Sequence, residues 1–574
     1  MRTHTTALLA ALLLGSAPLA VAQSSSASHT QTRDAGSQAE ERMGESPDRP
    51  LASALEARVT DGTTDDAVTS EFSEAVAKAV RHAYASRNFE PIWTESGAET
   101  FREESKHLFE HGIAVDDVFE RDLDTLISVR FGDNSPEERA EADTRLVLAA
   151  LRAAKAVGGD LSDARGIDLS SGAPKRSGLA DYLISTGKGE FASELEAFQP
   201  ANPQYGKLKD ALADYRELKE QGGWAAIPSG GIIEEGDTDK RVSAIRNRLA
   251  LEGFASEADS ENPDLFNTST VEALKAFQRR HGLKDDGVVG PNTLDAMNES
   301  VESKIARIAE TMHRWREHGD LGERYILANI PSYRAEGWNK GEREIAMKTV
   351  VGQARHATPT FSDQVEYLVV NPKWYVPKSI ARRQKLDDLK ADPSYANRKN
   401  FEVVNISSGQ AVDPASVNWN APDVFERFRL VQQPGEKNAL GQMKIIFPNQ
   451  YSVYLHDTPT EHLFDRAQRA FSSGCVRLER PFEMAKWVAE GDPDMSPEEF
   501  QTQLDSNERD RMYLGEELPV HITYHTVTVN EDGEAVFHRD VYDEIEGIEQ
   551  VERMAELSGS PRPRAAESSA KSSN

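Results

Sequence analysis

Residues 471–477 read Phe-Ser-Ser-Gly-Cys-Val-Arg and contain Cys475, the single cysteine of the 574-residue chain. Upstream, His456 ends the segment Tyr-Ser-Val-Tyr-Leu-His of residues 451–456. A single cysteine cannot form an intramolecular disulfide, so in an exported protein it is either an inert buried thiol or a reactive one. A neighbouring imidazole and backbone N–H dipoles generate a thiolate near neutral pH, and Gly474 permits the sharp turn that aims such dipoles. The combination predicts that Cys475 is a nucleophile and His456 its base.

The segments around this pair have the alternating pattern of β-strands. Strands are expected at residues 325–330, 366–371, 444–447 and 519–524, and a hairpin across residues 530–533. Pro448 and Asn449 interrupt the chain, and residues 451–456 are expected to resume as a paired strand with His456 at its end. The C-terminal part is therefore predicted to be mostly β, with its chemistry at strand ends and loops.

The N-terminal half is predicted to be helical. Apolar residues recur there at three- and four-residue spacing, which indicates amphipathic helices in a scaffold domain over residues 70–230. Residues 236–300 form a smaller module, with two helical faces and the turn cluster Asp-Gly-Val-Val-Gly-Pro at 286–291. A helix from Val301 to about His318 is expected to pack this module against the domain that follows. That domain is placed at residues 301–545.

Both ends of the chain have the composition of targeting or unstructured segments. Residues 1–22 combine a basic start, an apolar run and an Ala-Val-Ala cleavage site, and are interpreted as a signal peptide. Residues 23–69 and 557–574 are polar and poor in aromatic residues, and are predicted to be a disordered linker and a disordered tail. No other segment has the ~20 apolar residues that a membrane span needs. We expect a protein exported from the cytoplasm, with no transmembrane segment.

Charge and residue spacing exclude some classes of function. The chain has 66 Lys and Arg residues against 96 Asp and Glu residues, a net charge of −30. Such a field repels phosphate backbones, so nucleic acid is not an expected partner. The histidines show no ligand-like spacing, so neither a metal nor a cofactor is expected.

The residues around Cys475 carry a resemblance. The C-terminal region resembles the L,D-transpeptidase catalytic domain (YkuD family), in the large periplasmic form of Gram-negative bacteria. The resemblance rests on Val351-Gly352-Gln353, Asn371-Pro372-Lys373-Trp374-Tyr375-Val376-Pro377, Asn438-Ala439-Leu440-Gly441, His456-Asp457-Thr458-Pro459 and Ser472-Ser473-Gly474-Cys475-Val476-Arg477. Residues 84–93 are similar to the scaffold domain of that group, and residues 277–291 to a peptidoglycan-binding module. One position differs from many relatives: Ser473 stands where they carry histidine.

The resemblance implies a multidomain α+β fold: a helical scaffold domain, a small three-helix peptidoglycan-binding module and a mostly-β catalytic domain with a helical lid insertion at about residues 378–405. It implies a cysteine acyltransferase of the periplasm that forms 3→3 cross-links between the peptide stems of peptidoglycan. Cys475 would be the nucleophile, His456 the acid and base, and the backbone N–H groups of Ser473, Gly474 and Cys475 the oxyanion hole. The expected partners are stem peptides, glycan and other cell-wall enzymes.

Several roles stay open in the sequence. Arg477 is either a clamp for a stem carboxylate or a structural salt bridge. Tyr454 and Trp374 line the substrate groove or pack in a core, Asp457 orients a loop or the histidine, and Ser472 is a candidate substrate contact. Water as the acyl acceptor would give an L,D-carboxypeptidase, and a lipoprotein lysine a lipoprotein-anchoring enzyme. A non-catalytic cell-wall-binding protein with a relic catalytic fold is the alternative from another class.

Overall fold

The structure, a computed structural model, describes residues 49–119, 123–159, 161, 178–258, 261–319 and 321–545. The predicted signal peptide, the linker up to residue 48 and the predicted tail lie outside the described residues. Among the residues that are described, no helix is both long and apolar enough to cross a membrane.

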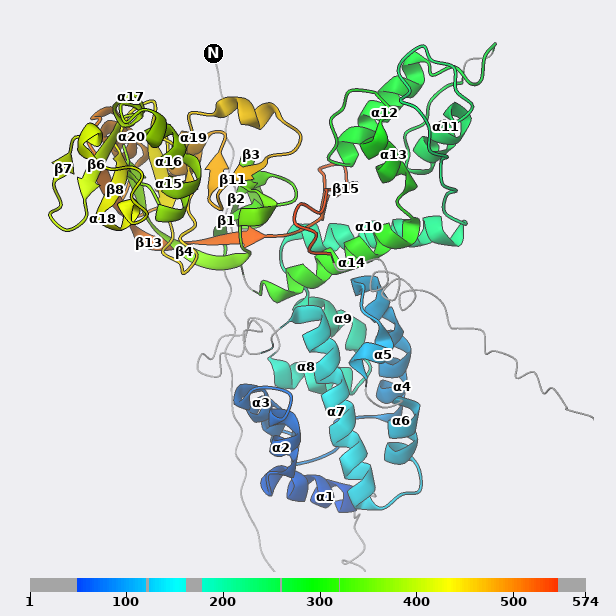
Figure 1. The fold of residues 1–574 in the computed structure, drawn as a ribbon. Coiled ribbons are helices and arrows are strands. Elements are labelled where there is room, and N and C mark those ends of the chain that lie inside the picture. Colours follow the sequence, from blue (N-terminus) through cyan, green and yellow to red (C-terminus); the bar gives the residue numbers. More distant parts are fainter. Residues whose placement is uncertain are drawn as a thin grey trace, which may run out of the picture. The chain divides into compact units, whose positions relative to one another are not determined.

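The N-terminal part is a helical body (Figure 1). Its elements are α1 (Arg49–Thr60), α2 (Thr63–Thr69), α3 (Glu74–Ala85), α4 (Glu95–Glu104), η1 (Ser105–His111), α5 (Val115–Val118), α6 (Leu123–Phe131), α7 (Pro136–Gly158), α8 (Leu179–Thr186), α9 (Phe191–Leu195) and η2 (Glu196–Phe198). The prediction of a disordered linker over residues 23–69 is wrong for its last part, because α1 and α2 are helices. Their Leu51, Leu55, Val59 and Val68 are buried in the core of this body.

Two long helices, α10 (Pro203–Glu220) and α14 (Val301–Glu317), pack side by side. Their apolar faces share one core with the hairpin of β14 (Val527–Val529) and β15 (Ala535–Phe537). The buried residues of α10 therefore belong to a core shared with elements far along the chain and not to the core of the helical body, although the sequence assigned this helix to the scaffold. The sequence predicted that the helix after the small module packs that module against the next domain. In the structure this helix, α14, shares a core with α10 and the β14–β15 hairpin.

The small module contains α11 (Val242–Leu251), α12 (Thr268–Arg280) and α13 (Pro291–Asn298) around a core of its own. Buried Gln278 organises its turn cluster. The side-chain amide of Gln278 donates to the Val288 carbonyl at 3.0 Å, and its oxygen accepts from the Gly287 amide at 2.8 Å. In this structure Gln278 of the module motif therefore stabilises the fold of the module.

The C-terminal part is built on a nine-stranded sheet, with the order β11-β3-β12-β10-β9-β4-β13-β1-β2. Because β3 also pairs with β2, the sheet closes on itself. Its strands are β1 (Arg324–Asn329), β2 (Arg334–Asn339), β3 (Glu342–Gly352), β4 (Phe361–Val370), β9 (Met443–Ile446), β10 (Leu455–His456), β11 (Ala470–Ser472), β12 (Val476–Leu478) and β13 (Asp510–Thr523). Two helices that the sequence did not predict, α19 (Pro481–Glu490) and α20 (Pro497–Asp505), add to its core.

Four of the predicted strands are confirmed in β1, β4, β9 and β13, but the one predicted at residues 451–456 is mostly wrong. Only Leu455 and His456 are in a strand. The Asn449 side chain holds the preceding segment as a turn, since it donates to the Val453 carbonyl and accepts from the Val453 amide, and Ser452 has a φ of 57°. His456 still lies at a strand end.

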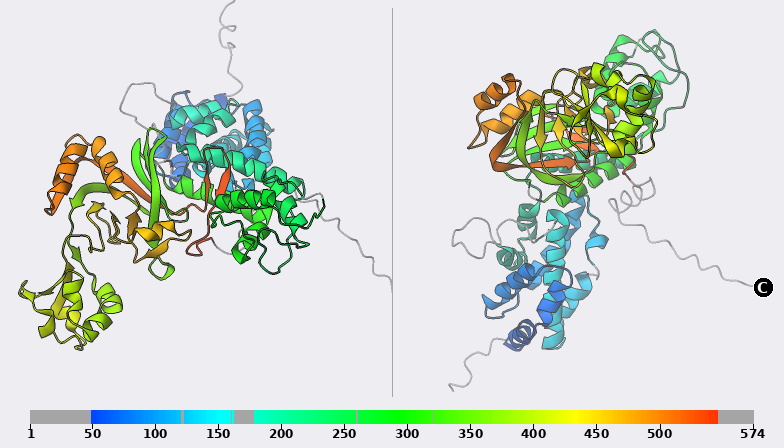
Figure 2. Two further views of the ribbon diagram at one scale, coloured as in Figure 1. Left: turned by 90° about the horizontal axis from the view of Figure 1, so that it is seen from above. Right: turned by 60° about the vertical axis from the view of Figure 1, so that its left-hand side comes forward.

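The insertion is larger than predicted and is not only helical. Its helices are α15 (Lys378–Gln384), α16 (Leu386–Ala391), α17 (Tyr395–Arg398) and α18 (Val424–Arg427), and its sheet has the order β5-β8-β6-β7. The strands are β5 (Trp374–Tyr375), β6 (Phe401–Asn405), β7 (Ala411–Val412) and β8 (Phe428–Gln432). These elements enclose a separate core, so the unit runs from 374 to 432 instead of 378 to 405. Figure 2 shows it as a lobe that stands apart from the large sheet.

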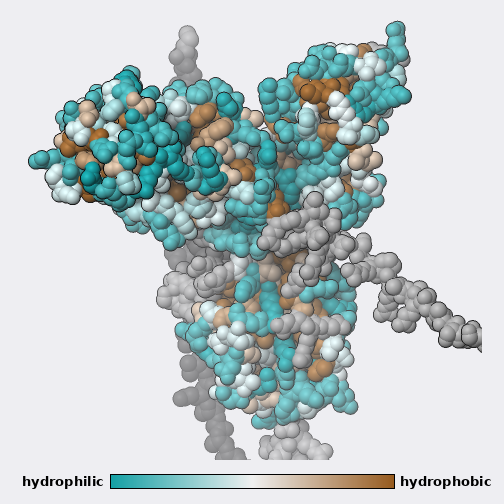
Figure 3. Space-filling view, viewed as in Figure 1, coloured by the Kyte–Doolittle hydropathy of each residue, from teal (hydrophilic) through white to brown (hydrophobic). Residues whose placement is uncertain are grey.

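The short 3₁₀ helices η3 (Ala354–His356), η4 (Pro414–Ser416) and η5 (Glu461–Asp465) complete the described elements. The face drawn in Figure 3 is mainly hydrophilic, as expected from the many Asp, Glu, Lys and Arg residues of the chain. The described architecture is α+β with several cores, which confirms the predicted fold class.

Candidate active site

The predicted nucleophile and base lie on neighbouring parallel segments of the large sheet. Leu455 pairs with Val476, and His456 pairs with Arg477 on one side and with Lys444 of β9 on the other. Leu455 and Val476 are buried in the core of the sheet, so the residues next to them face the opposite side. That outer face carries one row of side chains formed by Lys444, His456 and Arg477, and a second row that contains Tyr454 and Cys475.

His456 and Cys475 are diagonal neighbours on this face. The Val476 amide donates to the Tyr454 carbonyl at 3.2 Å, which continues the pairing of the two segments to the position of Cys475. With ~4.8 Å between strands and ~3.3 Å per residue, the Cα atoms of His456 and Cys475 are about 8 Å apart.

The turn that presents Cys475 is held by hydrogen bonds. The Ser472 hydroxyl donates to the Cys475 carbonyl at 2.6 Å and accepts from the Gly474 amide at 3.1 Å. Gly474 has a φ of 119°, which a residue with a Cβ rarely adopts, and its carbonyl accepts from the Thr358 hydroxyl at 2.8 Å. Ser472 therefore shapes the turn, and the sequence missed the contribution of Thr358.

One member of the predicted oxyanion hole is already occupied. The Gly474 N–H points at the Ser472 hydroxyl, so its prediction as an oxyanion donor is wrong for this conformation. The backbone N–H groups of Ser473 and Cys475 remain the candidates.

Cys475 is half-buried. Burial raises the pKa of its thiol above the ordinary value, although the backbone amide and hydroxyl of Tyr454 and the charges of Lys444 and Arg477 act in the opposite direction. The Cys475 Sγ lies 3.7 Å from the Ser452 carbonyl, which accepts from a thiol.

His456 is a buried, neutral imidazole, with an exposed fraction of 4%. Burial, followed by the charge of Arg477, lowers the pKa of His456 to about 3. Its Nδ1 faces the Asp457 carbonyl, and because a carbonyl only accepts, Nδ1 carries the proton. The unprotonated nitrogen is therefore Nε2, which can accept a proton.

Lys444 is a site residue that the sequence analysis missed. Its Nζ lies 4.6 Å from the centroid of the Tyr454 ring, and burial lowers the pKa of Lys444 to about 8 while Cys475 opposes that shift. The register of β9 and β10 places Lys444 beside His456. The irregular turn at residues 449–453 separates the two strands, so counting along the sequence cannot reveal that register.

Arg477 has no carboxylate within 4.0 Å among the residues that the structure describes, which argues against its reading as a structural salt bridge. It donates to the Thr460 hydroxyl at 2.9 Å, while its Nε is buried without a hydrogen-bond partner in the described part of the chain. Tyr454 is also on the site face, with its ring 5.6 Å from that of His456.

Two predicted residues have structural contacts. Asp457 accepts from the backbone amides of Gln442 at 2.8 Å and Thr458 at 2.6 Å, and thus fixes the loop behind His456. Trp374 lies in β5 of the insertion, 6.2 Å from the Phe401 ring, and packs against the core of that lobe. Of the two alternatives for Trp374, core packing fits these contacts.

Family models match three segments of the chain. The L,D-transpeptidase catalytic domain matches residues 323–494, the scaffold domain residues 78–212, and a domain described as "Putative peptidoglycan binding domain" residues 238–297. These segments correspond to the sheet that carries Cys475, to the helical body with most of α10, and to the small module.

Relatives of known name agree with these matches. A "Putative L,D-transpeptidase" of Haemophilus influenzae is 32% identical over 396 residues, which cover 66% of this chain and 75% of the relative. The N-acetylmuramoyl-L-alanine amidase CwlL of Bacillus licheniformis is 32% identical over 69 residues, 12% of this chain and 19% of the amidase. A solved L,D-transpeptidase of Stackebrandtia nassauensis is 12% identical and covers 52% of this chain and 95% of its own, but its TM-score of 0.19 is too low to support a conclusion.

The match to the Haemophilus influenzae relative is long, and the catalytic-domain model spans the strands that carry His456 and Cys475. This chain belongs to the L,D-transpeptidase family.

Proposed function

We propose that this protein forms 3→3 cross-links in peptidoglycan through an acyl-enzyme on Cys475. The observation that carries the proposal is the site face: a cysteine at a fixed turn, a diagonal neighbour that is a neutral imidazole with Nε2 unprotonated, and two cations without carboxylate partners among the described residues. A neutral imidazole is the form that accepts a proton from a thiol.

The first half-reaction transfers an acyl group to sulfur. The Cys475 Sγ attacks the carbonyl that joins the third and fourth residues of a tetrapeptide stem, and the thiol proton moves to Nε2 of His456. The C–N bond then breaks, and His456 returns the proton to the leaving D-alanine amine. A thioester between the stem and Cys475 remains.

In the second half-reaction the amine of another stem attacks the thioester. His456 takes the proton of that amine, the new amide bond forms, and the Cys475 sulfur leaves as thiol after the proton returns. No net redox change occurs, and D-alanine is the only other product.

Lys444 and Arg477 supply the charge that this chemistry needs. Both lower the pKa of the Cys475 thiol, so both favour the thiolate as it forms. The buried Nε of Arg477 has no hydrogen-bond partner among the described residues, and its guanidinium charge suits a stem carboxylate. The backbone N–H groups of Ser473 and Cys475 would hold the oxyanion, a contribution worth about 3–4 kcal/mol per donor.

The remaining parts fit the same role. The family acts on the cell wall, outside the cytoplasm, and we propose delivery to the periplasm by residues 1–22. We keep the peptidoglycan-binding module at residues 236–300 and the catalytic domain at 301–545. The scaffold domain is best extended at its start to residue 49, because buried residues of α1 and α2 belong to its core, while its family model reaches residue 212.

Acylation by a carbapenem tests the proposal, since such a drug is an acyl donor for cysteine. The intact protein should gain the mass of one drug molecule, while Cys475→Ala and Cys475→Ser should gain none. His456→Ala should acylate about 10²–10⁴-fold more slowly, because it removes the base. His462→Ala is the matched control, since that side chain is exposed in η5. Acylation of Cys475→Ala, or a parental rate for His456→Ala at pH 7, would refute the assignment.

A further inference from the structure

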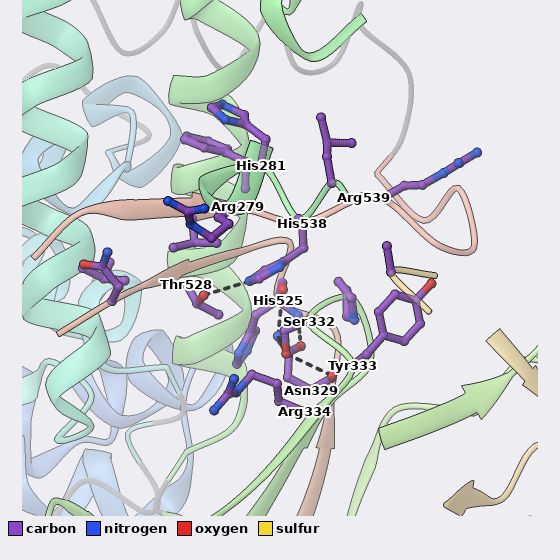
Figure 4. A pocket seen from close by; sticks show the side chains of 18 of the residues that line it. Arg279, His281, Asn329, Ser332, Tyr333, Arg334, His525, Thr528, His538 and Arg539 are labelled. Carbon is purple, nitrogen blue, oxygen red and sulfur yellow. Dashed lines mark hydrogen bonds between the residues drawn. The ribbon is translucent and has the colours of Figure 1, made fainter. Parts of the chain in front are cut away.

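A cleft of about 860 Å³ lies between the small module and the large sheet. Neither Cys475 nor His456 lines it. Its walls come from the end of α12, from the turn between β1 and β2, and from the hairpin β14–β15 with the residues that follow. Figure 4 shows Arg279 and His281 on one side, Tyr333 and Arg334 on the other, and His538 between them.

The lining of this cleft has a higher ratio of cations to acids than the whole chain. Seven Arg or Lys residues line it against five Asp or Glu residues, whereas the whole chain has 66 against 96. An anionic ligand would use those cations that no carboxylate already holds.

Most of the acids in the cleft are already neutralised. Glu299 pairs with Arg307 at 3.0 Å, and Glu336 and Glu531 pair with Arg343 at 3.2 and 2.6 Å. Three of the five carboxylates are thus satisfied by two of the seven cations. Of the other five cations, Arg279 and Lys348 pair with Asp285 at 3.4 Å and Glu479 at 3.3 Å, and Arg334 lies 3.7 Å from Glu336. Among the described residues, Arg469 and Arg539 are the lining cations with no carboxylate within 4.0 Å.

Arg469 is the most firmly held of these. Its guanidinium donates to the backbone carbonyls of Thr349 at 3.1 Å, Arg466 at 2.7 Å and Tyr333 at 3.1 Å. No carboxylate lies within 4.0 Å of it among the described residues. Carbonyl groups fix the position of a guanidinium without cancelling its charge, so Arg469 is a preorganised positive centre.

His538 contacts one of the cations of the cleft, because the Arg307 guanidinium donates to its backbone carbonyl. Burial, followed by the charges of Arg307, Arg334 and Arg469, lowers the pKa of His538 to about 3. Its Nε2 is 2.8 Å from the Thr528 hydroxyl. Three guanidinium groups from α14, β2 and the segment before β11 therefore act on one point in the cleft.

The cleft is connected to the catalytic turn by one short strand. Arg469 immediately precedes β11, and Cys475 follows six residues after Arg469. Six extended residues span at most about 22 Å, so a polymer can reach both places at once.

We propose that this cleft is a second subsite for peptidoglycan, which binds the carboxylates of a peptide stem other than the one that Cys475 attacks. The inference rests on the proposed function and names a substrate contact that it lacks. Free carboxylates of the stem suit a cluster of guanidinium groups, whereas the neutral hydroxyls of the glycan do not use them. A stem held there raises the local concentration of further stems at Cys475.

Binding of a soluble disaccharide-tetrapeptide fragment tests the subsite. The ligand is measured by calorimetry on the full-length chain with Cys475→Ala, so that turnover cannot consume it. Arg334→Gln combined with Arg539→Gln removes two exposed cations of the cleft and should weaken binding at least about tenfold. Lys78→Gln combined with Lys188→Gln makes the same change of net charge on exposed residues of the helical body, and should bind as the parent does.

The same fragment with its carboxylates amidated separates charge recognition from other contacts. The parent should bind it as weakly as the double arginine variant binds the unmodified fragment, and the variant should show little further loss. The inference would be overturned if the parent and the double arginine variant bound the unmodified fragment with equal affinity. It would also be overturned if amidation of the fragment lowered the affinity of both proteins by the same factor. Carbapenem acylation of the protein with Cys475 intact tests the proposed function separately. If the drug did not acylate the protein but the double arginine variant still bound the fragment more weakly, the proposed chemistry would be refuted and the anionic subsite would stand.

Discussion

At the level of single residues, the environment of the site keeps both reacting groups uncharged. Burial raises the pKa of Cys475, and burial with the charge of Arg477 lowers that of His456 to about 3. The resting state is therefore thiol and imidazole rather than a thiolate–imidazolium pair. Acylation should rise with pH as Cys475 ionises, and protonation of His456 should matter only near pH 3.

The charge of Lys444 should govern how readily Cys475 ionises. In Lys444→Met the midpoint of Cys475 alkylation should move to higher pH, because a cation that favours the thiolate is lost. Lys444→Arg should restore the parental midpoint or lower it, since a guanidinium stays charged over the whole range. Iodoacetamide reactivity against pH measures this, with the exposed Lys437→Met as control. Identical midpoints in Lys444→Met and parent would exclude the role.

Ser472→Ala should damage the catalytic turn itself. It leaves the Gly474 amide and the Cys475 carbonyl without their partner, at a cost of about 1–3 kcal/mol in the free energy of unfolding. Carbapenem acylation of this variant should also be slower than that of the parent. The neighbouring Ser473→Ala changes an exposed side chain and should stay within about 0.5 kcal/mol of the parent. Urea titration gives both values, and equal stabilities would contradict the described turn.

The sequence predicts the reactive pair well, because Cys475, Gly474 and His456 are recognisable by residue type alone. It does not predict Lys444, whose role depends on strand register across an irregular turn. It also assigned the Gly474 amide to the oxyanion and left Trp374 open between groove and core, since a motif does not say which hydrogen bonds its own side chains satisfy or in which lobe a tryptophan packs.

At the level of elements, a buried ionic network joins the module to the long helices. Glu252, whose side chain is fully buried, lies 3.2 Å from Arg248, 3.5 Å from Lys304 and 3.5 Å from His281, and accepts from the Tyr215 hydroxyl at 3.0 Å. Burial alone would raise the pKa of Glu252, but Lys304 and the other cations outweigh it, and its pKa lies far below the ordinary value. The charged carboxylate thus stabilises the contact of α11 and α12 with α10 and α14.

Glu252→Gln should cost about 3–5 kcal/mol in the free energy of unfolding at pH 7, because it leaves buried cations unpaired. A depressed carboxyl pKa contributes stability above the unfolded value of about 4.3, and this contribution declines as the pH falls below that value. The gap between parent and variant should therefore narrow from pH 5 towards pH 3. Tryptophan fluorescence follows the unfolding, with Trp224 as the probe nearest the network: its ring centroid is 3.6 Å from the Arg248 guanidinium carbon. Glu272→Gln, an exposed pair with Lys275, is the control.

A difference in unfolding free energy between parent and variant that stays constant over this pH range would show that Glu252 does not act through its charge.

Element prediction from sequence worked where periodicity was strong, as in α12, α14, β1 and β13. It failed for α1 and α2, where a polar composition hides the few apolar positions that become buried, and for the insertion, whose short strands give little periodic signal.

For the whole molecule, the order of domains follows from composition and motifs, but the way they share cores does not. The core of α10 and α14 includes β14 and β15, which lie more than 200 residues further along the chain than the last residue of α14. Such long-range packing leaves no local mark in a sequence. The module contacts the same hairpin, because Arg280 of α12 donates to the Ala535 carbonyl at 2.9 Å, so substitutions test its role better than deletion of residues 236–300.

The central claim is that Cys475 links stems by 3→3 transfer. Incubation of the intact protein with a purified disaccharide-tetrapeptide, followed by mass spectrometry, tests it most directly. We expect a cross-linked dimer whose mass equals two substrates minus one D-alanine, with release of that D-alanine in equal amount, and neither product from Cys475→Ala. Dimer formed by Cys475→Ala, or a parent that releases D-alanine without any dimer, would contradict the account.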